Sequence, residues 1–74
     1  STDQGIEILK KNMNKLNDWK NIFDLIPSQF KKTVNLKKSG LAGLFSAALE
    51  LSREGLISIM QKKNFDKVLI KEKK

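Results

Sequence analysis

The chain has 74 residues, enough for one domain with one small core, and 39% of them are hydrophobic, which favours a globular fold. It contains no cysteine and no histidine, which excludes disulfides, thiolate nucleophiles, Cys/His zinc sites and a histidine general base. Its net charge of +7 admits nucleic acid, an acidic membrane surface or an acidic protein as partner, or simply a solvated lysine-rich surface.

Apolar spacing predicts two helices in the first third of the chain. Residues separated by three or four positions share one helical face, and this spacing predicts a helix over 4–16. A second helix is predicted over 18–27, with Asp18 as its N-cap and Pro27 at its end, because proline has no amide hydrogen. Residues 28–38 carry no clean stripe and are predicted to be a connector. The two apolar faces consist of Ile6, Leu9, Met13 and Leu16, and of Trp19, Ile22, Phe23 and Ile26.

The strongest helical period predicts a third helix over 39–54, with Ser39 as N-cap and Gly55 as a left-handed terminator. Small residues along it would let another element approach closely, either the helix over 18–27 or a partner. We place its core face on Leu41, Phe45, Ala48 and Ser52, and its opposite face on Gly43, Ser46, Ala47, Glu50, Arg53 and Glu54.

Two short apolar runs around a polar turn predict a β-hairpin over 56–71. Three helices followed by a C-terminal two-stranded β-hairpin is the order of a winged helix. The predicted fold is therefore α+β, mostly α, a single winged-helix domain over 1–74; a three-helix bundle with a tail is the alternative. Residues 71–74 are expected to be frayed.

The predicted hairpin is apolar on both faces. In the first strand Leu56 and Met60 point one way and Ile57 and Ile59 the other, and in the second strand Leu69 points away from its neighbours. A hairpin in so small a domain covers the core with one face, so the other face predicts a docked partner. The predicted partner-binding residues are Ile57, Ile59, Met60, Gln61, Phe65 and Leu69.

A basic winged helix raises the alternative of nucleic-acid binding. The face opposite the predicted core of helix 39–54 is small at one end and carries two carboxylates at the other, which disfavours readout of bases in the major groove. Lysines elsewhere could track phosphates without reading sequence, or could simply be solvated. The candidates for phosphate contacts are Lys31, Lys32, Lys37, Lys38, Lys62 and Lys63.

The remaining expectations concern chemistry and compartment. The eight acidic residues stand singly along the chain, so we expect no metal site, no cofactor and no enzymatic activity. No apolar run approaches the ~18–20 residues that span a bilayer, and no signal-peptide pattern opens the chain, so we expect a cytoplasmic protein. Because the first residue is Ser1 and not methionine, we expect a fragment of a longer chain.

One ordered set of residues resembles a known family. The run FSAALEL over 45–51, followed by Gly55, Gln61, Phe65 and a closing apolar strand, is similar to the C-terminal domain of the bacterial kleisin family, segregation and condensation protein A. The upstream Trp19 and the helix end at residues 25–27 fit the same family.

This resemblance implies a winged helix that binds the ATPase head of an SMC protein, on the nucleoid, in chromosome condensation and segregation. It implies contacts with segregation and condensation protein B through parts of the full-length chain that are not present here, DNA contact that is indirect or weak, and no membrane. The family often has acidic residues before the phenylalanine, whereas this chain has Lys62, Lys63 and Asn64, which reverses the charge at the hairpin tip.

Overall fold

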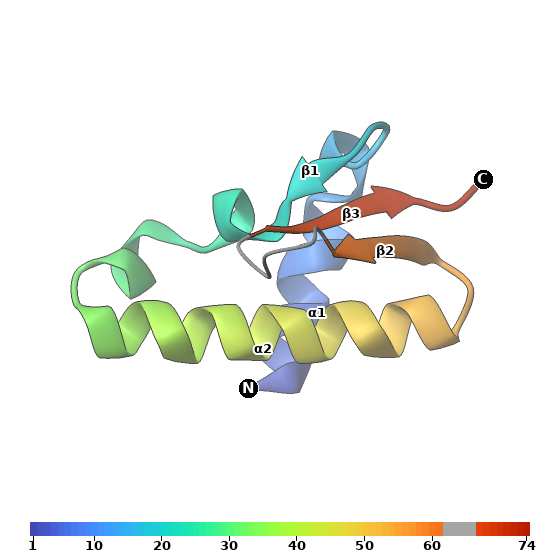
Figure 1. Cartoon of the computed structure of the whole chain (residues 1–74). Coiled ribbons are helices and arrows are strands. Elements are labelled where there is room, and N and C mark those ends of the chain that lie inside the picture. Colours follow the sequence, from blue (N-terminus) through green and yellow to red (C-terminus); the bar gives the residue numbers. More distant parts are fainter. Residues whose placement is uncertain (62–66) are drawn as a thin grey trace.

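The computed structural model describes residues 1–61 and 67–74, which form two α-helices and a three-stranded antiparallel sheet (Figure 1). The predicted α+β, mostly helical class is confirmed, but the described residues contain two α-helices where three were predicted and three strands where two were predicted. The elements are α1 (Thr2–Lys11), β1 (Lys20–Asn21), α2 (Val34–Arg53), β2 (Ile57–Gln61) and β3 (Val68–Glu72), with 3-10 helices at Met13–Lys15, Ile22–Leu25 and Ser28–Lys31.

Helix α1 is capped at both ends, and its caps decide its length. The Ser1 hydroxyl accepts a hydrogen bond from the Gln4 amide at 3.3 Å, and the Gln4 side chain accepts one from the Ser1 amino group at 3.2 Å. At the other end Asn12 donates from its side chain to the Ile8 carbonyl oxygen at 2.7 Å. The helix therefore ends before residue 16, where it was predicted to end, and a 3-10 turn carries the chain on to Leu16.

The helix predicted over 18–27 is wrong. The Asp18 carboxylate accepts from the Trp19 amide at 2.8 Å, and the Asn21 side chain accepts from the Phe23 amide at 3.0 Å. Such local bonds compete with helical hydrogen bonds, and here they favour a short strand followed by 3-10 turns. The two residues of β1 are further held by pairing with β3, a long-range interaction that local periodicity does not reveal.

Helix α2 begins at Val34, five residues earlier than the predicted start at residue 39, because its N-cap is Thr33. The backbone of Thr33 is extended, and its hydroxyl accepts from the Leu36 amide at 3.1 Å. Ser39 lies inside the helix, so its predicted role as N-cap is wrong, and so is the connector over 28–38.

The C-terminus of α2 is as predicted. Gly55 has φ of 81°, in the left-handed region that favours glycine. Its amide donates to the Ser52 carbonyl oxygen, and the Leu56 amide donates to the Leu51 carbonyl oxygen, both at 3.0 Å. These two bonds form the Schellman motif that ends many helices.

The core face of α2 differs from the predicted one. The buried residues are Leu44, Ala47, Ala48 and Leu51, whereas Leu41 is 37% exposed. The reason is the approach of α1 to the small residues of α2. A Cβ atom on Gly5 would lie 2.5 Å from the Gly43 carbonyl oxygen and 2.9 Å from the Ala47 Cβ atom, so the helices touch where Gly5 has no side chain. The small residues thus serve packing within the domain, but mainly against α1 and not against residues 18–27.

The hairpin is present, and β3 lies in the middle of the sheet, in the order β1-β3-β2. Residues 71 and 72 belong to β3. Two further main-chain hydrogen bonds hold the end of the chain: the Glu72 amide donates to the Leu16 carbonyl oxygen at 2.7 Å, and the Lys73 amide donates to the Leu56 carbonyl oxygen at 3.0 Å. The expectation of frayed residues from 71 onward is therefore wrong as far as Lys73.

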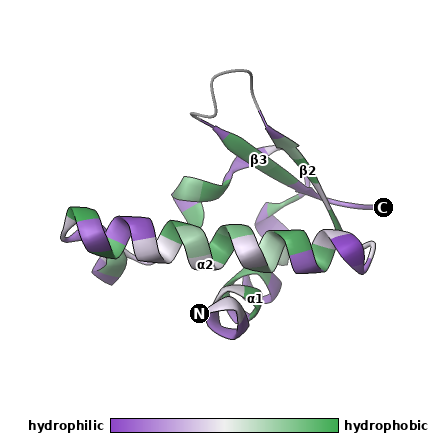
Figure 2. Cartoon of the chain, turned by 60° about the horizontal axis from the view of Figure 1, so that its bottom comes forward, coloured by the Kyte–Doolittle hydropathy of each residue, from purple (hydrophilic) through white to green (hydrophobic). Residues whose placement is uncertain are grey.

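The core lies between α1, α2 and one face of the sheet, and among the described residues it buries no polar side chain. Figure 2 shows the hydrophobic middle of α2 below the strands and more polar residues at both of its ends. In the ranges 1–61 and 67–74, no helix has the length and apolar character needed to cross a membrane. The buried side chains are those of Leu9, Leu16, Ile22, Leu25, Ile26, Leu44, Ala47, Ala48, Leu51, Ile57 and Ile70.

Candidate interaction surface

The sheet has two faces, and only one of them packs on the helices. Ile59 of β2 lies opposite Ile70 of β3, and both belong to the core side, together with Ile57 and Val68. Because side chains alternate along a strand, the residues between them point to the other side. We call this other side the outer sheet face, formed by Asn21, Ser58, Met60, Leu69 and Lys71, with Trp19 beside Lys71 and Leu56 directly before β2.

Leu69 lies at the centre of the outer sheet face. It stands opposite Met60 on one neighbouring strand and opposite Asn21 on the other. One step further along the same register, Trp19 faces Lys71, and the lysine Nζ lies 5.7 Å from the centre of the indole ring. The three strands therefore bring apolar side chains from residues 19, 60 and 69 onto one surface.

The apolar side chains of this face are exposed or half-buried. Leu56 is 40% exposed and Trp19 is 38% exposed, while Met60 and Leu69 are half-buried. Figures 1 and 2 show α2 on one side of β2 and β3, and no described helix lies over their opposite face. Strand β2 is also at the edge of the sheet, so its outward main-chain groups have no strand partner among the described residues.

The predicted partner-binding residues divide between the two faces. Met60 and Leu69 lie on the outer sheet face, whereas Ile57 is buried and Ile59 packs against the core. Gln61 is exposed at the end of β2, and Phe65 lies outside the described residues. Neither Ile57 nor Ile59 is presented to a partner, because the register turns both toward α2.

Prediction from sequence missed Trp19 as a member of this surface, because it placed Trp19 on a helix. The signal that could have found it is the spacing of two between Trp19, Asn21 and Phe23, which is the period of a strand. Phe23 is 38% exposed, and the Lys31 Nζ lies 5.1 Å from its ring centre. Each such cation–π contact contributes about 0.5–1 kcal/mol at an exposed site and helps to hold the ring in place.

The lysines predicted to contact phosphate gather at one end of the molecule. Lys31 ends the 3-10 helix Ser28–Lys31, Lys32 follows it, and Lys37 and Lys38 lie in the first turns of α2. All residues over 32–39 are exposed. Lys62 and Lys63 lie outside the described residues. In the part of the chain that is described, the ion pair found is Arg53–Glu50 at 3.4 Å, near the opposite end of α2.

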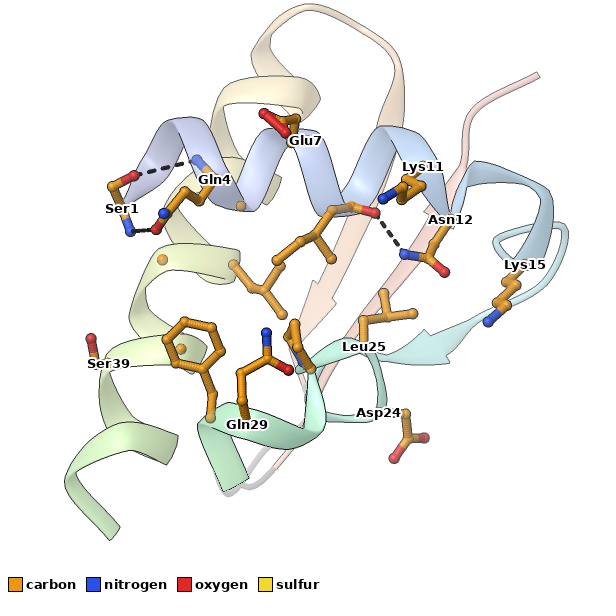
Figure 3. A pocket seen from close by; sticks show the side chains of 17 residues that line it. Ser1, Gln4, Glu7, Lys11, Asn12, Lys15, Asp24, Leu25, Gln29 and Ser39 are labelled. Carbon is orange, nitrogen blue, oxygen red and sulfur yellow. Dashed lines mark hydrogen bonds between the residues drawn. The ribbon is translucent and has the colours of Figure 1, made fainter. Parts of the chain in front are cut away.

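A groove of about 650 Å³ runs between α1, the segment 24–30 and α2 (Figure 3). Its floor is apolar, with Leu25, Phe30 and Leu44, and its rim is polar. Figure 3 shows Glu7 and Asp24 on opposite walls, so the groove does not bring these two carboxylates together. Among residues 1–61 and 67–74, no group of three or more acidic, histidine or cysteine side chains is close enough to hold a metal ion.

No family model matches the chain, and no curated protein matches it.

Proposed function

We propose that this chain is a protein-interaction domain that docks on its partner through the outer sheet face. The observation that carries the proposal is the group of Trp19, Met60 and Leu69, exposed or half-buried on the side of the sheet that the helices leave uncovered. Large exposed apolar patches on small domains mark interaction sites, and an aromatic residue at such a site is a common binding anchor. Here Trp19 is that aromatic residue.

The resemblance of residues 45–65 to the bacterial kleisin family supplies the partner in this proposal. We propose the ATPase head of an SMC protein, with a role in chromosome condensation and segregation on the nucleoid. Contacts with segregation and condensation protein B would then belong to other parts of a full-length chain. The domain would carry no catalytic residue, since the ATPase belongs to the partner.

The arrangement of the elements supports a winged helix within this proposal. Helix α2 is followed directly by the hairpin of β2 and β3, which is the helix and wing of that fold. The helix expected between the first and last helices of a winged helix is replaced by two 3-10 turns at Ile22–Leu25 and Ser28–Lys31. The first of these turns still buries Ile22 and Leu25 in the core, as a helix at that place would.

The test is calorimetric titration of the domain with a purified SMC head. Leu69→Lys places a charge at the centre of the outer sheet face, and we expect it to weaken binding at least tenfold, because a central contact is worth about 1–3 kcal/mol. Leu49→Lys is the matched control, since Leu49 is also an exposed leucine but lies on α2. We expect the affinity of Leu49→Lys to lie within about threefold of the parent's, because surface substitutions usually change free energies by less than ~0.5 kcal/mol.

Both variants must unfold at the parent's urea midpoint for the comparison to count. A folded Leu69→Lys variant with parental affinity would refute docking through the outer sheet face. Ile59→Lys is unsuitable as a probe, because Ile59 packs against the core and the charge would act on stability.

A further inference from the structure

We propose that the lysine-rich start of α2 is a binding site for the phosphodiester backbone of nucleic acid, separate from the outer sheet face. We call it the basic end and define it as Lys31, Lys32, Lys37 and Lys38. The inference goes beyond docking on a protein partner, and it uses different residues from those of the outer sheet face.

The two pairs of lysines lie at the same end of the molecule, because the 3-10 helix Ser28–Lys31 packs on α2. A Cβ atom on Gly40 would lie 3.2 Å from the Phe30 Cβ atom, so the turn lies directly against the helix. Figures 1 and 2 both show this end of α2 extending past the strands. The basic end is therefore a projecting part of the molecule, in which Lys32, Lys37 and Lys38 are exposed and Lys31 is half-buried beside Phe23.

No acidic residue occurs between Asp24 and Glu50, so the basic end lies in a segment of one charge sign. The carboxylates that argued against DNA binding at the level of sequence, Glu50 and Glu54, are at the other end of α2. Twelve residues separate Lys38 from Glu50, about 18 Å at 1.5 Å per residue. That distance exceeds the Debye length of about 8 Å at physiological salt, so these carboxylates reduce the attraction between the lysines and a phosphate only slightly.

The chemistry of the basic end suits a backbone of regularly spaced phosphates. Lysine ammonium groups are flexible donors that track phosphates without selecting a sequence. The side chains of Asn35 and Ser39 are exposed among them and can donate further hydrogen bonds to phosphate oxygens. The half-exposed ring of Phe23 beside Lys31 adds a stacking surface for an unpaired base.

Fluorescence anisotropy with a labelled duplex and with a single strand of the same sequence tests the site. With about four phosphate contacts, the logarithm of affinity for the duplex should fall against the logarithm of salt with a slope of about −3.6, so a fourfold rise in salt should weaken binding about 150-fold. Tighter binding of the single strand would assign part of the affinity to Phe23, and tighter binding of the duplex would assign it to the lysines alone.

The location is tested by replacing all four lysines, Lys31→Gln, Lys32→Gln, Lys37→Gln and Lys38→Gln, in one variant. The matched control removes the same charge elsewhere, through Lys10→Gln, Lys11→Gln, Lys15→Gln and Lys74→Gln. We expect the first variant to lose at least about 30-fold in affinity at low salt and nearly all of its salt dependence, since each lost phosphate contact lowers the slope by about one. The control should keep the parent's slope of about −3.6, because its phosphate contacts remain.

Three results would overturn the proposal: no DNA binding by the parent chain at low salt, equal losses in the two variants, or equally tight binding of polyglutamate at the same ionic strength. The last result would assign the basic end to an acidic protein. The four-lysine variant should still bind the SMC head, and Leu69→Lys should still bind DNA. Failure of one site would therefore be distinguishable from failure of the other.

Discussion

The contact between Gly5 and Gly43 offers a sharp test of how the two helices pack. In an exposed helix, replacing glycine by alanine stabilises by about 1 kcal/mol. Gly5→Ala, however, would place a methyl group 2.5 Å from the Gly43 carbonyl oxygen and 2.9 Å from the Ala47 Cβ atom. Both atoms belong to the buried side of α2, so α1 must move away, and overpacking of this kind costs typically about 1–3 kcal/mol.

We expect the overpacking to exceed the gain in helix propensity, for a net loss of up to about 2 kcal/mol. With a urea m-value of about 1 kcal/mol/M for a small domain, the unfolding midpoint should fall by up to about 2 M. Gly43→Ala is the control on the facing helix. Its methyl group would lie 3.2 Å from the carbonyl oxygen of Ser1, at the chain end, where a small shift relieves the contact. We expect that variant to be as stable as the parent or up to about 1 kcal/mol more stable.

The two variants are compared by urea unfolding followed by circular dichroism. A Gly5→Ala protein that is more stable than the parent would refute the close crossing of α1 and α2. Equal effects of the two substitutions would refute the argument that Gly5 alone points into the contact.

Further predictions concern the ends and the face of α2, and all are measured as free energies of unfolding in urea. Thr33→Ala should cost about 1 kcal/mol, because it removes the N-cap hydrogen bond. Ser39→Ala should be neutral or slightly stabilising, because Ser39 lies inside the helix. A larger loss of stability for Ser39→Ala than for Thr33→Ala would indicate that the helix starts at residue 39. Gly55→Ala should cost about 1 kcal/mol, because φ of 81° strains any side chain, and an unchanged midpoint would contradict this. Leu51→Ala should cost about 2–5 kcal/mol, because Leu51 is buried, and Leu41→Ala less than about 1 kcal/mol, because Leu41 is exposed. Similar losses at both sites would indicate that Leu41 belongs to the core face, as predicted from sequence.

The α+β class, the hairpin and the glycine that ends α2 could be predicted from local signals. Gly55 follows a long helical period, and the two apolar runs around residues 62–67 are short and rich in β-branched residues. These features depend on neighbours in sequence. The start of α2 was also a local feature, but Thr33 was overlooked because Ser39 stands nearer to the strongest apolar stripe.

The core face of α2 and the nature of residues 18–31 could not be predicted in the same way. The middle of α2 is apolar on most sides, so the period alone does not choose between Leu41 and Leu44. The choice is made by α1, whose Gly5 lies directly against the Gly43 carbonyl oxygen and Ala47. Strand β1 exists because β3, some fifty residues away, pairs with it at Lys20↔Ile70 and Asn21↔Leu69.

The same distinction holds for the candidate interaction surface. Alternation in the hairpin predicted that one face would be left uncovered, and Met60 and Leu69 lie on that face. It could not say which face, and so Ile57 and Ile59 were included although both turn toward the core. Trp19 joins the surface only through the pairing of β1 with β3.

The central claim is that the outer sheet face is the docking surface, and Trp19 reports on it directly because it is the sole tryptophan of the chain. The domain is labelled with 5-fluorotryptophan and titrated with unlabelled SMC head, and the fluorine resonance is followed by NMR in H₂O and in D₂O. We predict that the resonance moves on binding and that its solvent isotope shift falls, because the partner covers the ring. A resonance that keeps both its position and its isotope shift when the head is saturating would contradict the account.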